Sequence, residues 1–222
     1  NLYYYFGDVK NLGKINEKNF KVLDSPLIKN GNEIYYFGEK LDIKNPEKFE
    51  VIRNDLSDPS MIIYGKDDKN VYVVTPYKEA GHLKIIKNAD KDTFEVMQNS
   101  NYSKDKNNIY YAEYNVVQLQ DVDKNSFILV EDEDFSYDKK NVYYQGKCIK
   151  GVTPATIKLV DPLHIKTTQQ VFFENTLIAN ADALTFRTLN GGYARDKYRY
   201  YKDGKEISSE DNQLKEFLKT QM

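Results

Sequence analysis

A short hydrophobic pattern, an aliphatic residue followed by an aromatic one, recurs along the chain. Its copies are Leu2-Tyr3, Ile34-Tyr35, Val71-Tyr72, Ile109-Tyr110, Val142-Tyr143 and Val171-Phe172, with a degenerate seventh copy at Arg199-Tyr200. Successive aromatics lie 32, 37, 38, 33, 29 and 28 residues apart. Such spacing indicates a tandem repeat, in which each unit buries its apolar face only by stacking on its neighbours.

A polar segment rich in Asp, Lys and Asn precedes most of these pairs. Clear copies are residues 102–108 (YSKDKNN) and 137–141 (YDKKN). Asp and Asn favour tight turns because their side chains hydrogen-bond the local backbone and tolerate left-handed geometry. Since apolar residues flank each turn, the segment predicts a β-hairpin.

A second apolar position recurs between the hairpins, four residues after a residue that favours helix N-caps. The apolar residues are Phe20, Phe49, Phe94, Phe127, Ile157 and Phe186, and the caps are Asn16, Asn45, Asp90, Asp123, Thr153 and Asp182. Such caps accept hydrogen bonds from the first free backbone N–H groups of a helical turn. Each repeat is therefore predicted to be a hairpin, a capped turn and a short strand.

The pattern ends near residue 208. Residues 208–222 place Leu214, Phe217 and Leu218 on one helical face, with Ser208 or Ser209 as the N-cap. We therefore divide the chain into a β-repeat array at 1–207 and a C-terminal helix at 208–222. The helix is expected to cap the last repeat, because the ends of a solenoid need covering; binding a partner is the alternative.

The predicted fold is all-β, an open twisted array or solenoid of six to seven tandem repeats with a short C-terminal capping helix. A closed β-propeller is the alternative, because seven copies would suit one. The repeats of about 30 residues are short for four-stranded blades of about 40 to 45 residues.

Composition mainly excludes classes of function. The 222 residues carry 32 Lys+Arg and 34 Asp+Glu, a net charge of -2 that gives no electrostatic support for nucleic-acid binding. No apolar stretch approaches the roughly 18 to 20 residues of a membrane helix. The single cysteine, Cys148, allows no internal disulfide and no multi-thiolate metal site. We expect no metal, no cofactor and no enzymatic activity.

The two histidines offer little chemistry. Cys148 and His164 are the only residues from which a Cys-His dyad could be built, and no orienting group lies nearby in the sequence. His82 falls in a longer loop and is expected to be solvent-exposed. The Asp-Lys-Asn turns resemble calcium loops superficially, but Lys106, Lys139 and Lys197 bring positive charge into them. A structural turn is the expected role.

The repeated segments resemble the DKNYY repeat family of bacteria. The best matches are residues 102–111, 137–149 and 89–96, and weaker similarity runs from about residue 1 to 207. Residues 165–173 depart from the pattern, with TTQQ at 167–170. The resemblance implies a periplasmic or cell-envelope protein, and some members look like immunity proteins that neutralise secreted toxins.

The N-terminus bears on localisation. The chain begins at Asn1 rather than at Met, so we expect that its N-terminus has been trimmed, either by removal of a signal peptide or lipoprotein leader or by the choice of the expressed segment. A lipid anchor is compatible with this expectation, whereas a membrane-spanning segment is not expected.

Two features are candidate partner-binding sites. The first is a row of aromatic residues, Tyr35, Tyr72, Tyr110, Tyr143, Phe172 and Tyr200. Because neighbouring side chains on a strand point to opposite faces, one ring of each aromatic pair is expected in the core and the other in an exposed ladder. Tyr ladders bind proteins or sugars. The alternative is that both rings pack between adjacent repeats.

The second candidate is the acidic run Glu131, Asp132, Glu133 and Asp134, which would dock a basic partner. Its alternative role is a solvated loop between repeats. The leading hypothesis is a non-enzymatic protein-binding repeat protein that occludes a partner such as a secreted toxin. A glycan- or cell-wall-binding module using the Tyr ladder is the alternative. A hydrolase is a third hypothesis and needs two carboxyls about 5 to 9.5 Å apart.

Overall fold

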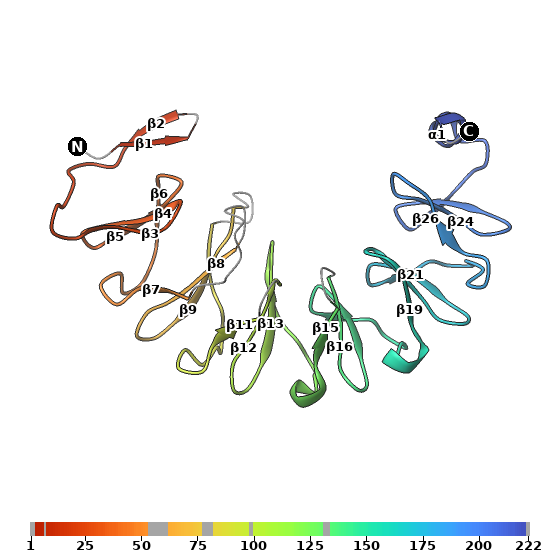
Figure 1. The fold of residues 1–222 in the computed structure, drawn as a ribbon, viewed down its shortest axis with the longest axis horizontal. Helices are drawn as coiled ribbons and strands as arrows, with labels where there is room; N and C mark the ends of the chain where they lie inside the picture. Colours follow the sequence, from red (N-terminus) through yellow and green to blue (C-terminus); the bar gives the residue numbers. More distant parts are fainter. Residues whose placement is uncertain are drawn as a thin grey trace. The chain divides into compact units, whose positions relative to one another are not determined.

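The computed structural model describes residues 3–6, 8–52, 62–76, 82–97, 100–130 and 134–220. The described strands form one two-stranded sheet and six four-stranded sheets (Figure 1). Each sheet is built from consecutive antiparallel strands, so that every repeat is a small β-meander. The prediction of an all-β tandem repeat array is confirmed.

The strands, in chain order, begin with the hairpin β1 (Tyr3–Phe6) and β2 (Asp8–Asn11). Sheet I contains β3 (Phe20–Asp24), β4 (Leu27–Asn30), β5 (Glu33–Tyr36) and β6 (Glu39–Leu41). Sheet II contains β7 (Glu50–Ile52), β8 (Ile63–Lys66), β9 (Val71–Val74) and β10 (Leu83–Ile85). Sheet III contains β11 (Glu95–Val96), β12 (Tyr102–Lys104), β13 (Ile109–Ala112) and β14 (Val116–Gln118).

The remaining sheets follow the same plan. Sheet IV contains β15 (Ile128–Leu129), β16 (Phe135–Tyr137), β17 (Val142–Tyr144) and β18 (Lys147–Cys148). Sheet V contains β19 (Lys158–Asp161), β20 (His164–Lys166), β21 (Val171–Phe173) and β22 (Thr176–Leu177). Sheet VI contains β23 (Arg187–Thr188), β24 (Tyr193–Arg195), β25 (Tyr200–Lys202) and β26 (Lys205–Ile207).

The capped turns lie before the first strand of each sheet, as predicted. The carboxylate of Asp90 accepts a hydrogen bond from the Thr93 backbone N–H at 3.1 Å. Asp182 caps its turn in the same way, through the Thr185 N–H at 3.0 Å. The same N–H groups also donate to the backbone carbonyls of the capping aspartates at 3.2 Å, so side chain and backbone together close the turn before the strand begins.

Each four-stranded repeat has one strand more than predicted. In sheets I, IV and VI the fourth, outer strand follows a tight two-residue turn, such as Gln145-Gly146, in which both residues have positive φ (47° and 74°). Turns of this kind join neighbouring antiparallel strands. The outer strands are two to three residues long (β18 and β14, for example), too short for a hydrophobic pattern to reveal them. Four such strands fit into a repeat of about 30 residues, a length that had suggested fewer strands.

The chain divides into two compact units, residues 1–119 and 120–222. Within each unit the core lies between neighbouring sheets rather than inside one sheet. In the first unit, Tyr64 of sheet II packs in one cluster with Phe94 and Tyr110 of sheet III. In the second unit, Val171 of sheet V packs with Tyr201 of sheet VI. Tyr72 of sheet II also packs with Tyr36 of sheet I, and Phe172 of sheet V packs with Tyr144 of sheet IV. Both faces of sheets II and V are therefore covered.

The C-terminal helix, α1 (Asn212–Thr220), packs on sheet VI. The ring of Phe217 stacks on that of Tyr193 with 4.4 Å between centroids, and Leu214 is fully buried. The N-cap is Asp211, whose carboxylate accepts from the Leu214 N–H at 2.9 Å. The expected cap at Ser208 or Ser209 is wrong, because a turn at these serines precedes the helix. No helix among the described residues is long and apolar enough to cross a membrane.

Candidate functional site

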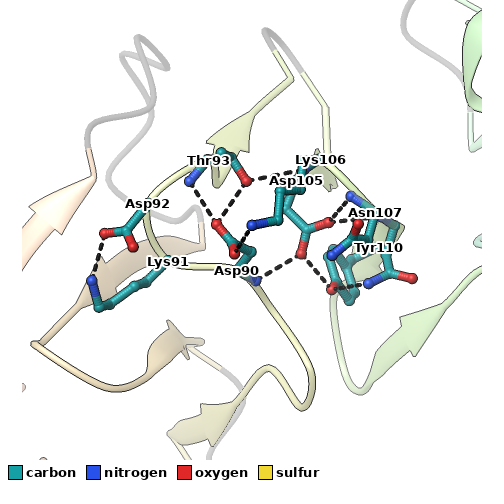
Figure 2. A network of polar contacts seen from close by, with 9 residues as sticks. Asp90, Lys91, Asp92, Thr93, Asp105, Lys106, Asn107 and Tyr110 are labelled. Atoms are coloured by element: carbon teal, nitrogen blue, oxygen red, sulfur yellow. Dashed lines mark hydrogen bonds and ion pairs between the residues drawn. The ribbon is translucent and has the colours of Figure 1, made fainter.

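A buried aspartate closes the hairpin turn of sheet III and ties it to the capped turn before the sheet (Figure 2). The Asp105 carboxylate accepts hydrogen bonds from the backbone N–H groups of Asn107 at 2.6 Å and Asn108 at 2.7 Å. It also accepts from the Asp90 N–H at 2.8 Å and from the Tyr110 hydroxyl at 2.8 Å. One side chain thus joins the hairpin, the capped turn and an inner strand.

The same network occurs in three further sheets, always between an aspartate and the tyrosine five residues later. The pairs are Asp67 and Tyr72 at 2.5 Å, Asp138 and Tyr143 at 3.0 Å, and Asp196 and Tyr201 at 2.7 Å. Each of these aspartates also accepts from the backbone N–H of the capping residue of its repeat. The network is therefore a repeated structural link.

Electrostatics agree with this structural role. Burial by itself would raise the pKa of the Asp105 carboxyl, but hydrogen bonds from three backbone N–H groups and from Tyr110 outweigh burial and lower it. Burial, reinforced by the hydrogen bond to Asp105, raises the pKa of the Tyr110 hydroxyl. The pair is held as carboxylate and neutral phenol at neutral pH, which leaves no group poised to exchange a proton.

The lysines of the turns pair with the capping aspartates. The Lys106 ammonium lies 2.7 Å from the Asp90 carboxylate, and the hydrogen bond from Lys106 contributes most to lowering the pKa of Asp90 to about 2. Lys139 forms the same ion pair with Asp123. The acidic oxygens of these turns thus face a side-chain cation, in keeping with the expected structural turn.

The predicted aromatic ladder is buried. Tyr72, Tyr110 and Tyr143 have 0% of their surface exposed, and Tyr35 and Phe172 are also buried. The expectation of an exposed ladder is wrong at these five positions. The rings of Tyr72, Tyr110 and Phe172 pack between adjacent repeats, as the alternative proposed, and the hydroxyls of the three tyrosines bind the turn aspartates.

The last copy of the ladder is also shifted by one residue. The hydroxyl that reaches Asp196 belongs to Tyr201, whereas Tyr200 is half-buried and lies under the Arg195 guanidinium at 5.3 Å. Tyr200 therefore occupies the position that is aliphatic in other repeats. The constant five-residue separation between aspartate and tyrosine is the sequence signal that would have given the correct register.

The acidic run is described only at its end. Glu131, Asp132 and Glu133 lie outside the described residues. Asp134 is half-buried, and its carboxylate accepts from the Gln145 side-chain amide at 2.9 Å. Its backbone carbonyl accepts from the Gln145 N–H at 3.0 Å. These contacts close the end of the β16–β17 hairpin.

A groove in the first unit is the hollow that bears on function. It has a volume of about 990 Å³ and crosses β6, β10 and β14, the outer strands of sheets I, II and III. Its apolar lining consists of Leu41, Leu83, Ile85 and Val116. Its charged lining consists of Glu39, Lys40, Asp42, Lys44, Lys84 and Lys87. The groove therefore combines apolar and charged side chains.

His82 forms part of the groove wall. The prediction that its side chain is solvent-exposed is wrong. Its Nδ1 lies 2.8 Å from the Thr75 carbonyl oxygen, and its Nε2 lies 3.5 Å from the Glu39 carboxylate. Its ring also meets that of Tyr36 edge-on, with 5.3 Å between centroids. These contacts hold the imidazole in place.

The Cys148–His164 dyad considered in the sequence analysis does not form. Cys148 is exposed on β18, whereas His164 on β20 is only 2% exposed. The Nδ1 of His164 lies 2.8 Å from the Asp161 carboxylate. Among the described residues no contact joins the two side chains, so the pair is not arranged for nucleophilic catalysis.

A second row of positions, which the sequence did not reveal, lies on the outer strands opposite the buried aromatics. The cross-strand partners of Tyr35, Tyr72, Tyr110, Tyr143, Phe172 and Tyr201 are Lys40, Ile85, Gln118, Cys148, Leu177 and Glu206. All six partners are exposed or half-buried, and their chemistry differs from sheet to sheet. The first three line the groove. A repeating scaffold therefore presents variable side chains at one fixed position.

Comparison with known proteins bears on the repeat. The model of the DKNYY family matches residues 44–114 and 113–164, so the matched region covers residues 44–164, more than half of the 222 residues. The chain belongs to the DKNYY family. No curated protein and no solved structure matches this DKNYY chain.

The residues behind the DKNYY name each make a structural contact in sheet IV. Asp138 accepts the turn hydrogen bonds, and Lys139 pairs with the capping aspartate. The Asn141 amide donates to the Tyr143 hydroxyl at 3.2 Å. Tyr144 packs against a neighbouring ring in the core. The motif that defines a DKNYY repeat thus builds the scaffold of the sheet.

Proposed function

We propose that this chain is a non-enzymatic binding protein that holds a protein partner against the groove in its first unit. The observation that carries the proposal is the groove itself, which joins apolar side chains such as Ile85 and Val116 with a charged rim. Protein–protein interfaces combine an apolar centre with a polar rim in this way.

The backbone of the groove supports the same proposal. β6, β10 and β14 each end their sheet, and no strand in the described part of the chain pairs with their outer edges. The backbone groups on a sheet edge bind extended segments of other proteins. Since the turn network fixes the sheets, the groove is held ready for a partner with little ordering cost.

The identity of the partner remains part of the proposal. The family resemblance favours a secreted toxin, which the chain would neutralise by covering its surface in the cell envelope. A periplasmic location and a lipid anchor belong to the same proposal.

The other two hypotheses lack a supporting observation. The glycan-binding hypothesis relied on exposed Tyr rings, and the rings of Tyr72, Tyr110 and Tyr143 are buried. A hydrolase of this kind also needs a carboxyl group with a raised pKa. Each described carboxyl whose pKa is shifted has it lowered, as at Asp67 and Asp123.

The test is a capture experiment with two matched variants. Ile85 and Leu177 occupy the same position in sheets II and V and are 40% and 48% exposed, but only Ile85 lines the groove. We expect Ile85→Asp to weaken capture of the wild-type partner by about tenfold or more, because it places a charge in an apolar contact. Leu177→Asp should capture normally. Equal capture by both variants would refute a role for the groove.

A further inference from the structure

We infer that the segment bound in the groove is an extended, acidic stretch of a partner protein in which apolar residues lie between the acidic ones. This inference rests on the proposed function and specifies its partner. It follows from the balance of charge in the groove and from the side chains between the charges.

The carboxylates of the groove are already paired. Its four lysines, Lys40, Lys44, Lys84 and Lys87, face only two acidic residues, Glu39 and Asp42. Asp42 forms an ion pair with Lys44. Glu39 accepts a hydrogen bond from the Lys10 ammonium of β2 at 3.2 Å. Neither acid is therefore free to neutralise the other lysines.

Two lysines have no acidic partner among the described residues. The ammonium of Lys84 donates to neutral acceptors, the Tyr114 carbonyl and the Asn115 side-chain oxygen. Lys87 is exposed and forms no hydrogen bond or ion pair with any described residue. Lys40 pairs with Glu33, which lies outside the groove lining. The groove thus offers at least two positive charges to a partner, and complementary charge steers and orients binding.

The apolar lining favours a polypeptide over a simple polyanion. Leu83, Ile85 and Val116 lie beside the lysines, and Ile85 remains 40% exposed. A phosphate polymer or polyglutamate has no apolar side chains to cover these residues, whereas a mixed segment gains the free energy of burying them. The outer strand edges add backbone hydrogen bonds that only a polypeptide matches fully.

The second unit offers a matched control. Lys84 lies opposite Val73, and Lys147 lies opposite Tyr144 at the same position in sheet IV. Lys87 and Lys150 each follow the buried isoleucine, Ile86 or Ile149, that comes directly after the outer strand. Lys147 and Lys150 are both exposed and do not line the groove. The two pairs therefore share register and charge and differ in location.

The experiment selects a random peptide library, displayed on phage, on the full chain. Three forms are compared: wild type, Lys84→Glu with Lys87→Glu, and Lys147→Glu with Lys150→Glu. We expect wild type and the second double variant to enrich peptides with net negative charge and interspersed apolar residues. The groove variant should bind these peptides about tenfold or more weakly, as measured by fluorescence anisotropy. Circular dichroism confirms that all three forms are folded.

Several outcomes would overturn the inference. These are no enriched peptide, enrichment without a bias toward acidic residues, or equal weakening by the two double variants. If polyglutamate or inorganic polyphosphate displaces an enriched peptide at equal charge concentration, the site is a general polyanion site and the inference fails. A partner whose capture depends on Ile85 but whose bound segment is not acidic would leave the proposed function intact and refute only the inference.

Discussion

Sheets III and V stabilise their hairpin turns with different hydrogen bonds. In sheet III the Asp105 carboxylate links the hairpin turn to the capping residue and to the Tyr110 hydroxyl. In sheet V the turn residue is Thr167, whose hydroxyl accepts only from the backbone N–H groups of Gln169 at 3.1 Å and Gln170 at 2.9 Å. The aromatic five residues later is Phe172, which has no hydroxyl.

In sheet V, Thr167 replaces the turn aspartate and Phe172 replaces the tyrosine, and the capped turn differs as well. The Thr153 backbone N–H bonds to the Thr156 hydroxyl at 3.4 Å instead of to the hairpin turn. Each turn of sheet V is thus closed on itself, whereas those of sheet III are joined. The comparison teaches that carboxylate and phenol depend on each other, because a buried polar group without its partner costs free energy.

The largest effect should come from removing the carboxylate of sheet III. Asp105→Ala leaves three backbone N–H groups and the Tyr110 hydroxyl without their acceptor, so we expect the free energy of unfolding to fall by about 3 kcal/mol. Thr167→Ala removes only two turn hydrogen bonds and should cost about 1 kcal/mol. Urea denaturation followed by circular dichroism measures both. Similar losses would mean that the link between the turns contributes little.

A smaller effect is expected from building the network into sheet V. Phe172→Tyr should destabilise the chain, because it places a hydroxyl without its acceptor at a buried position, whereas Thr167→Asp keeps an acceptor for the two turn N–H groups and should change the stability little. Together they should be more stable than the sum of the single changes by about 1 kcal/mol. A double-mutant cycle of unfolding free energies measures this coupling. Simple additivity would contradict the interdependence of the pair.

The smallest effect concerns pH. The folded pKa of Asp105 lies below its ordinary value of 3.8, so its stabilising contribution is complete above that value and is lost as the pH falls through the folded pKa. Asp105→Asn removes this titration while keeping an acceptor oxygen, as at Asn30 of sheet I, which accepts from the Asn16 N–H at 2.7 Å. The difference between the urea midpoints at about pH 7 and about pH 3 should be smaller for Asp105→Asn than for the wild type. An equal or larger difference would contradict the prediction.

Much of the local structure could be predicted from the sequence. The caps at Asp90 and Asp182 and the hairpin turns were predicted because their hydrogen bonds join residues close in the chain. The outer strands were missed, because two or three residues such as those of β18 carry no periodic pattern. The groove was missed because its lining comes from three successive repeats, residues 39–118, and no local pattern joins them.

The sequence by itself determined the repeat and its turns, since spacing and side-chain chemistry act within a few residues. The tertiary structure decided which aromatics are exposed. Alternation along a strand predicts one buried and one exposed ring, yet Tyr35 and Tyr36 of sheet I are both buried. Tyr35 packs with Leu12 on one face of the sheet and Tyr36 packs with Tyr72 of sheet II on the other, so neither ring is left exposed. The exposed side chains lie instead on the outer strands, at positions such as Ile85 and Leu177.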